Sequence, residues 1–186
     1  NLGGYTVGVL VQTNFGGDLN VNGAPVGREL GQYSYQTQLE EARQGVVPMD
    51  GGSMMMVVAT DAPILSRNLD RLAKRGMMGL ARTGSVAHNS SGDYVIAFST
   101  SPDVRRDRGA REPVPAKTLS NTAMSPLFQA VVEAIQESVY NAMLKAETVK
   151  SSRGTLEAID VDKVKEIVEK YNVTNFDEKL SPGKVN

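Results

Sequence analysis

The sequence predicts a layered α/β fold in which helices pack on a β-sheet. Residues 53–60 and 93–100 are apolar over nearly their whole length, which is typical of central strands covered on both faces. Residues 65–81 and 127–146 repeat apolar side chains at helical spacing. Because an amphipathic helix must bury its apolar face, helices of this kind combined with such strands favour a helix-on-sheet arrangement.

The composition fits one globular domain and excludes several kinds of site. The chain has 186 residues, of which 40% are apolar and 22% charged. It has no cysteine, which excludes disulfides and thiolate chemistry, and its single histidine, His88, excludes a multi-histidine metal centre. The net charge of −1 gives no basic excess for nucleic acid, and no stretch has the roughly 18 apolar residues of a membrane span. We therefore expect no cofactor, metal, nucleic acid or membrane partner.

The first third of the chain predicts a strand, a hairpin turn and a long loop. Residues 5–12 are β-rich and run into a polar turn at residues 13–17. The dipeptide Asn22-Gly23 is a strong hairpin-turn signal. Residues 28–52 are polar and contain glycine and proline, so we expect a surface loop there.

The middle of the chain predicts a strand, a helix and a second strand. Asp61-Ala62-Pro63 ends the strand at residues 53–60. The helix over residues 65–81 has Ser66 as its expected N-cap and Gly84 as its stop. The second apolar strand follows at residues 93–100.

The last third predicts a charged loop and two helices. Residues 101–121 contain proline and four arginines, and a solvated loop is favoured there over an anion site. Ser125-Pro126 begins the helix that runs to residue 146, and a shorter helix is expected over residues 160–171.

Two polar segments lie where strands begin or end, and each has a catalytic and a structural interpretation. Asn14 follows the first strand, where its carboxamide N–H can donate to an oxyanion or simply stabilise a turn. Asp50-Gly51-Gly52-Ser53 leads into the apolar strand, either as a glycine-rich bend or as a self-cleaving bond. In self-cleavage the Ser53 hydroxyl attacks the Gly52 carbonyl, and the α-amino group that is released then serves as base for the same hydroxyl.

A third polar segment, residues 83–93, joins the helix to the second strand. It gathers hydroxyls, an amide, an imidazole and a carboxylate, and it contains His88, Ser91 and Asp93. A helix C-cap and turn is the structural interpretation. On residue types alone, His88 in such a polar loop is more often exposed than catalytic.

Together these segments resemble a specific family. Residues 4–16, 53–63, 79–100 and 130–149 are similar, in order and spacing, to the DmpA-type aminopeptidases, which include L-aminopeptidase/D-esterases and β-peptidyl aminopeptidases. The similarity runs from about Gly3 to Gly154, and residues 155–186 follow no pattern of the family.

The resemblance implies a four-layer αββα sandwich, like that of N-terminal-nucleophile hydrolases, and a precursor that cuts itself before a serine. Carried over by position, Gly52-Ser53 is the processed bond, Ser53 the nucleophile and Asn14 the oxyanion donor. Ser91 and Asp93 are the partners that orient Ser53 and its amine. The family needs no histidine at the position of His88.

The resemblance also implies a division of the chain and a set of partners. Residues 1–52 correspond to the C-terminal part of a large subunit, including the loop 28–52, and residues 53–186 to a small subunit. We expect the upstream part of the large subunit as a partner, a small peptide or an amino-acid amide or ester as substrate, and a homo-oligomer of processed heterodimers. Two alternatives stay open: an unprocessed, non-enzymatic binding or assembly protein, and a related acyltransferase that passes the acyl group to an amine.

Overall fold

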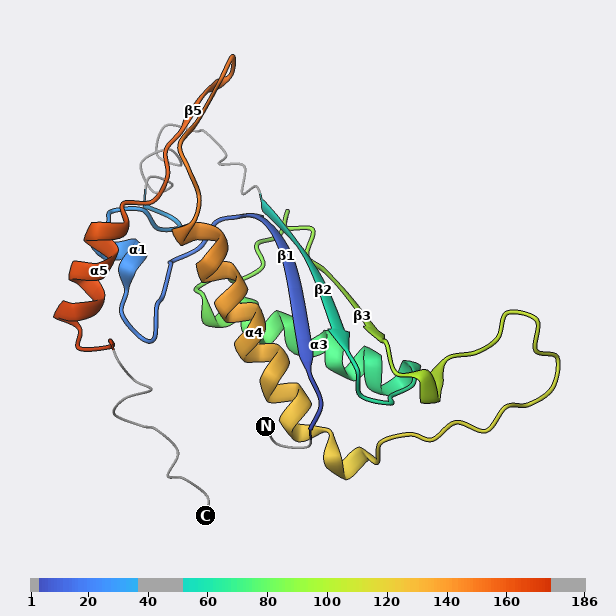
Figure 1. Cartoon of the computed structure of the whole chain (residues 1–186). Coiled ribbons are helices and arrows are strands. Elements are labelled where there is room, and N and C mark those ends of the chain that lie inside the picture. Colours follow the sequence, from blue (N-terminus) through green and yellow to red (C-terminus); the bar gives the residue numbers. More distant parts are fainter. Residues whose placement is uncertain (1–3, 37–51, 175–186) are drawn as a thin grey trace.

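The computed structural model describes residues 4–36 and 52–174, which form a three-stranded sheet, two long helices on one of its faces, and a smaller lobe (Figure 1). The elements are β1 (Val7–Phe15), α1 (Val26–Glu29), β2 (Gly52–Thr60), α3 (Ser66–Arg82), β3 (Tyr94–Ser99), α4 (Ser125–Leu144), β4 (Val149–Ser151), β5 (Gly154–Leu156) and α5 (Val161–Lys170). The predicted strands and long helices are thus present in the predicted order. The short hairpin β4–β5 is not among the predicted elements.

The sheet has the order β1-β2-β3, with β2 in the centre. β2 is antiparallel to β1, with a register that runs from Val7 opposite Thr60 to Phe15 opposite Gly52. β3 is parallel to β2, and α3 makes the crossover between them. Because a parallel connection needs a long crossover, the helix between the two strands is what allows this pairing.

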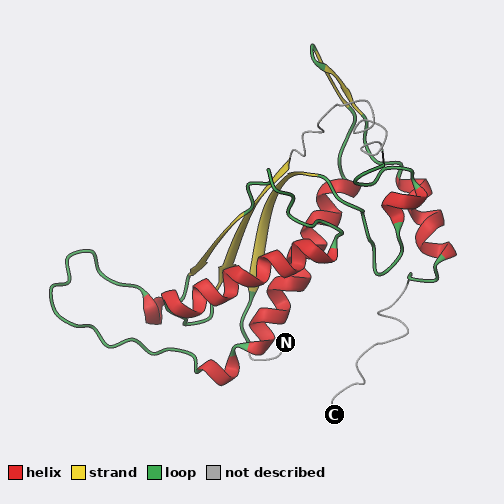
Figure 2. Ribbon diagram, turned by 180° about the vertical axis from the view of Figure 1, so that it is seen from behind, coloured by secondary structure: helices red, strands yellow, loops and turns green. Residues whose placement is uncertain are grey.

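One face of the sheet is covered by α3 and α4, which lie side by side across it (Figure 2). Met54, Met56 and Val58 of β2 are fully buried beneath them. On the helices the core is completed by leucine, valine and isoleucine side chains, namely Leu72, Leu80, Leu127, Val131, Ile135 and Val139. Alternation along β2 therefore places the even-numbered residues in the core and the odd-numbered ones on the opposite face.

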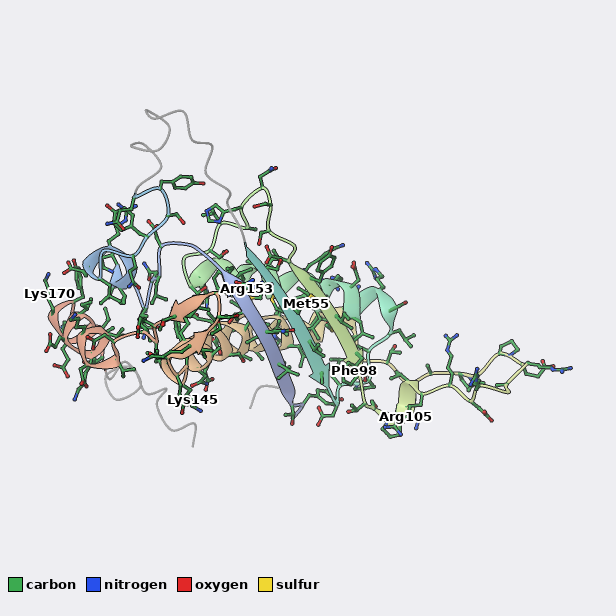
Figure 3. The ribbon with its side chains drawn as sticks, turned by 90° about the horizontal axis from the view of Figure 1, so that it is seen from above. Met55, Phe98, Arg105, Lys145, Arg153 and Lys170 are labelled. Carbon is green, nitrogen blue, oxygen red and sulfur yellow. The ribbon has the colours of Figure 1, made fainter. Side chains whose placement is uncertain are left out.

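The opposite face of the sheet is apolar and open. Leu10 is 71% exposed and Ile96 56% exposed, and Met55 and Phe98 lie on the same face (Figure 3). The strands at residues 53–60 and 93–100 are thus covered on one face rather than on both, because among the described residues no second sheet or helix packs on this face of the three-stranded sheet. A contiguous apolar surface of this kind marks an interaction site.

A second, smaller core lies beyond the end of the sheet. Val21 and Ala24 close the predicted hairpin turn, in which Asn22 and Gly23 have φ of 51° and 97°, as a tight turn of this hand requires. Ala24 and Val26 are buried there against α5. The Asp160 side chain caps α5 by accepting from the Lys163 backbone N–H.

Three further details differ from the predictions or refine them. Ser66 is the first helical residue of α3 rather than its N-cap, because the Leu65 carbonyl already accepts from the N–H groups of residues 68 and 69. The loop expected at residues 28–52 includes the end of α1, and its residues 37–51 lie outside the described residues. The charged loop after β3 is an exposed arm that begins near Arg105 (Figure 3).

Gly79 on α3 provides a test of the helix packing. A Cβ at this position would lie 2.7 Å from the Ile135 Cβ and 2.7 Å from the Val132 carbonyl oxygen, so α3 and α4 would have to separate. We expect Gly79→Ala to lower the free energy of unfolding by about 1–3 kcal/mol in urea titrations. Gly76→Ala is the matched control, because its nearest neighbours are side-chain methyl groups of Val95, at 3.1 and 3.2 Å. Equal or greater stability of Gly79→Ala than of wild type would contradict this packing.

Candidate active site

Ser53 lies at the start of β2, opposite Asn14 at the end of β1. Side chains of directly paired residues lie on the same face of a sheet, about 4.5–5.5 Å apart at Cβ. Ser53 and Asn14 are therefore neighbours on the open face, where Asn14 is exposed and Ser53 half-buried. The antiparallel register thus brings together two residues that are 39 positions apart in the sequence.

The carbonyl of Gly52 is surrounded by hydrogen-bond donors. The Ser53 Oγ donates to this carbonyl oxygen at 2.6 Å, and the Gly92 backbone N–H donates to it at 3.3 Å. The same N–H lies 3.3 Å from the Ser53 Oγ, so it is shared between the two oxygens. The serine hydroxyl and a backbone donor therefore both face the peptide group that precedes Ser53.

Glycine is required at position 52 because β1 passes very close. A Cβ there would lie 2.9 Å from the Phe15 Cα and 3.2 Å from the Asn14 carbonyl oxygen, and Gly52 has φ of +156°. Asp50 and Gly51, the other residues of the predicted glycine-rich segment, lie outside the described residues. The close approach of β1 is thus the reason why glycine is needed at position 52.

Ser91 and Asp93 flank Gly92, but neither forms a hydrogen bond with Ser53. The Ser91 N–H donates to the His88 carbonyl oxygen at 2.8 Å in a turn. The Oδ1 atom of Asp93 is buried and has no hydrogen-bond partner among the described residues. An unpaired buried carboxylate oxygen is unusual, because desolvation without a partner costs free energy.

Gly92, which lies between the two predicted residues, is the functional candidate that sequence reasoning missed. It acts through a backbone N–H, which has no side-chain signature. A Cβ at Gly92 would lie 3.3 Å from the Ser53 Oγ, so close approach to the serine favours glycine. A glycine between two polar residues was the one signal available in the sequence.

His88 is engaged away from Ser53. It is half-buried, its Nε2 lies 3.4 Å from the Ser34 Oγ, and its ring meets the Tyr35 ring edge-on at 5.8 Å between centroids. It is therefore more enclosed than residue type alone suggested. Its serine neighbour is Ser34 and not Ser53, so the geometry does not form a Ser53–His pair.

A cavity of about 520 Å³ adjoins the end of β1. Its wall is made by the end of β1, the segment that follows it, the C-terminal ends of α3 and α4, and the segment just before α5. The lining residues are Thr13, Asn14, Phe15, Gly16, Gly17, Leu19, Gly27, Leu30, Gln32, Tyr33, Ser34, Thr83, Met143 and Ile159. Within the part of the chain that is described, no cluster of acidic or histidine side chains is arranged to hold a metal ion, and no helix is long and apolar enough to cross a bilayer.

The fold is that of the N-terminal-nucleophile hydrolases. The structure of L-aminopeptidase D-Ala-esterase/amidase from Ochrobactrum anthropi, described as a variant of that fold, matches with a TM-score of 0.69 and 26% identity over 89% of this chain and 48% of that one. The PH0078 protein from Pyrococcus horikoshii OT3 matches with a TM-score of 0.76 and 38% identity over 92% of this chain and 45% of that one. The predicted fold class is confirmed.

The chain belongs to peptidase family S58, whose model matches residues 1–156. Beta-peptidyl aminopeptidase BapA from Sphingosinicella microcystinivorans is 39% identical over 175 residues, which cover 90% of this chain and 44% of the relative. The resemblance to the DmpA-type aminopeptidases is thus confirmed. The match to this relative extends past residue 156, so part of the C-terminal segment is also shared. The chain spans less than half the length of these relatives.

Proposed function

We propose that this chain is the nucleophile-bearing part of a self-processing serine aminopeptidase. The observation that carries the proposal is the position of the Ser53 Oγ, 2.6 Å from the carbonyl oxygen of the residue before it. Membership of peptidase family S58 supports a hydrolase that acts on peptide bonds. The proposed substrates are small peptides and amino-acid amides or esters from which the N-terminal residue is removed.

In the proposed processing step, the Ser53 Oγ attacks the Gly52 carbonyl carbon. The C–N bond between Gly52 and Ser53 breaks, an ester forms at Oγ, and the hydroxyl proton ends on the departing nitrogen. Negative charge develops on the Gly52 oxygen, toward which the Gly92 N–H points at 3.3 Å. Water then hydrolyses the ester, which leaves a Gly52 carboxylate and a Ser53 with a free α-amino group.

In the proposed hydrolytic cycle, the free amine of Ser53 accepts the proton from Oγ as Oγ attacks the substrate carbonyl. The amine then gives the proton to the leaving group, and water releases the acyl group from Oγ. Asn14 shares the face of Ser53 and is the proposed oxyanion donor. Ser91 and Asp93 are proposed to orient the new N-terminus, for which the buried Oδ1 of Asp93, without a partner among the residues that the structure describes, is an available acceptor.

We further propose that the open sheet face binds a second sheet from the rest of the full-length protein. Leu10, Met55 and Ile96 on this face are exposed apolar side chains. The relatives are more than twice as long as the part of them that this chain covers. A second sheet at this position would complete the four layers of the sandwich. It would also cover the proposed site on the side of the sheet opposite α3 and α4.

Substitution of Ser53 tests self-processing directly. We expect wild-type full-length protein to yield two masses that divide the chain between Gly52 and Ser53, and Ser53→Ala to yield one uncut mass without amidase activity. Ser90→Ala, an exposed hydroxyl in the nearby loop, is the control and should be cut normally. Cleavage before residue 53 in Ser53→Ala would contradict the assignment of Ser53 as the nucleophile. If the wild-type protein is uncut and inactive, the alternative of a non-enzymatic family member is favoured. If the cut protein transfers the acyl group to an added amine in preference to water, the acyltransferase alternative is favoured.

Asn14→Ala tests the oxyanion donor. Loss of one such donor typically lowers the rate by about 10²- to 10³-fold, so kcat on an aminoacyl p-nitroanilide should fall by that factor in protein that has been cut. Gln12→Ala is the control, because Gln12 is exposed on the same face of β1, two residues earlier. An unchanged kcat in Asn14→Ala would show that Asn14 is not the oxyanion donor and has only a structural role at the end of β1.

Asp93→Asn tests the amine as base. The amine must be neutral to accept a proton, so kcat/KM should rise with pH through the pKa of the amine, which is about 8 when unperturbed. A nearby carboxylate favours the protonated amine and raises this pKa, so Asp93→Asn should move the rise to lower pH. His88→Gln is the control and should leave the profile unchanged. If His88→Gln removes a change in kcat/KM near pH ~6.5, and Asp93→Asn does not shift the pH profile, a histidine would be indicated as the base instead.

A further inference from the structure

The smaller core joins residues from the two sides of the proposed cleavage point. Ala24 and Val26, before Gly52, are fully buried against Val164 and Ile167 of α5, which are 5% and 8% exposed. Figure 1 shows α5 alongside α1. Among the described residues this core shares no member with the main core between the sheet and the long helices. It is therefore a separate contact between the upstream and downstream parts of the chain.

An ionic contact closes the edge of the same core. The Lys170 Nζ and the Tyr171 hydroxyl donate to the two carboxylate oxygens of Glu29 at 2.8 and 2.7 Å. The hydrogen bond from Lys170 is the main cause that lowers the pKa of Glu29, and the bond to Glu29 raises the pKa of Lys170 and of Tyr171. The contact thus stays charged across neutral pH. Figure 3 shows Lys170 at the end of the molecule far from Arg105.

α5 has little other support in the part of the chain that is described. An apolar cavity of about 320 Å³ lies between α5 and the C-terminal end of α4, lined by Met143 and Leu144 on one side and Val164 and Val168 on the other. The buried face of α5 therefore depends on the segment with residues 19–30 and not on close packing against α4. The dependence is mutual, because Val26 and Ala24 are covered by α5.

The segment held by α5 also forms the wall of the larger cavity beside Asn14. Leu19, Leu30 and Ile159 line that cavity and pack against the smaller core as well. Movement of α5 away from Glu29 would therefore change the shape of the cavity wall. Before cleavage the segment is joined to β1 at one end and to β2 at the other. After cleavage only the β1 end remains joined, and loss of this loop closure increases the freedom of the segment.

We propose that α5 is a clamp across the cleavage point, which holds residues 19–30, and with them the cavity wall beside Asn14, once the chain is cut. This inference rests on the proposed function. Glu29 and Lys170 are positioning residues in it, because they act through the cavity wall and not on the reacting atoms. The clamp should therefore affect substrate binding more than the chemical step.

The test uses the full-length protein with Lys170→Glu, which places two carboxylates together, and with the charge-swapped pair Glu29→Lys/Lys170→Glu. Lys165→Glu is the matched control, because it makes the same charge change at an exposed position of α5 that forms no ion pair in the described structure. We expect Lys170→Glu to raise KM by about 3- to 10-fold while kcat stays within about twofold. The swapped pair should bring KM most of the way back to the wild-type value. This would not happen if Lys170→Glu acted by a general loss of folding.

Hydrogen exchange gives a readout that does not depend on activity. Amides of residues 19–30 should exchange faster in Lys170→Glu than in Lys165→Glu, and the difference should be larger in cut protein than in the uncut Ser53→Ala background. Equal exchange of these amides in both variants of the cut protein, or a swapped pair as defective as Lys170→Glu, would overturn the clamp alone. An uncut wild-type mass would instead overturn the proposed function.

Discussion

The antiparallel pairing of β1 with β2 is the contact on which the rest of the candidate site depends. Its register sets Asn14 opposite Ser53 and Phe15 opposite Gly52, and it brings β1 so close to Gly52 that no Cβ can be accommodated there. This pairing also joins the two parts of the chain that cleavage would separate. A shift of one residue would move Ser53 to the helix-covered face, because successive side chains alternate between faces. The location of the site is therefore a consequence of register.

The two faces of the sheet have different roles. The face under α3 and α4 is filled by Met54, Met56 and Val58, and it provides the stability that fixes the strand positions. The open face carries Ser53 and Asn14 among apolar side chains. A further layer of the full-length protein over the open face would limit the access of bulk solvent to the proposed site. The proposed nucleophile, Ser53, thus lies at the start of the central strand, on the open face.

The loop before β3 contributes to the site in two ways. Gly92 supplies a backbone N–H to both oxygens at the proposed cleavage point, whereas Asp93 has a buried oxygen without a partner in the described part of the chain. This arrangement suits the proposed role of Asp93, in which its carboxylate gains a partner only when processing frees the Ser53 amine. The smaller core around α5 acts at a greater distance, on the segment that follows β1. The loop before β3 and the smaller core around α5 therefore both support the region where β1 ends.

The sequence by itself determined the three strands of the main sheet, the long helices and the family, because these depend on local patterns of side chains. It also identified Asn14, Ser91 and Asp93 as candidates, through the resemblance. Only the tertiary structure decided that Gly92 and not its neighbours contacts Ser53, that His88 pairs with Ser34, and that α5 packs on residues 19–30. These features depend on register, on backbone N–H groups and on contacts between distant segments, and apart from the glycine at position 92 none of them leaves a local pattern in the sequence.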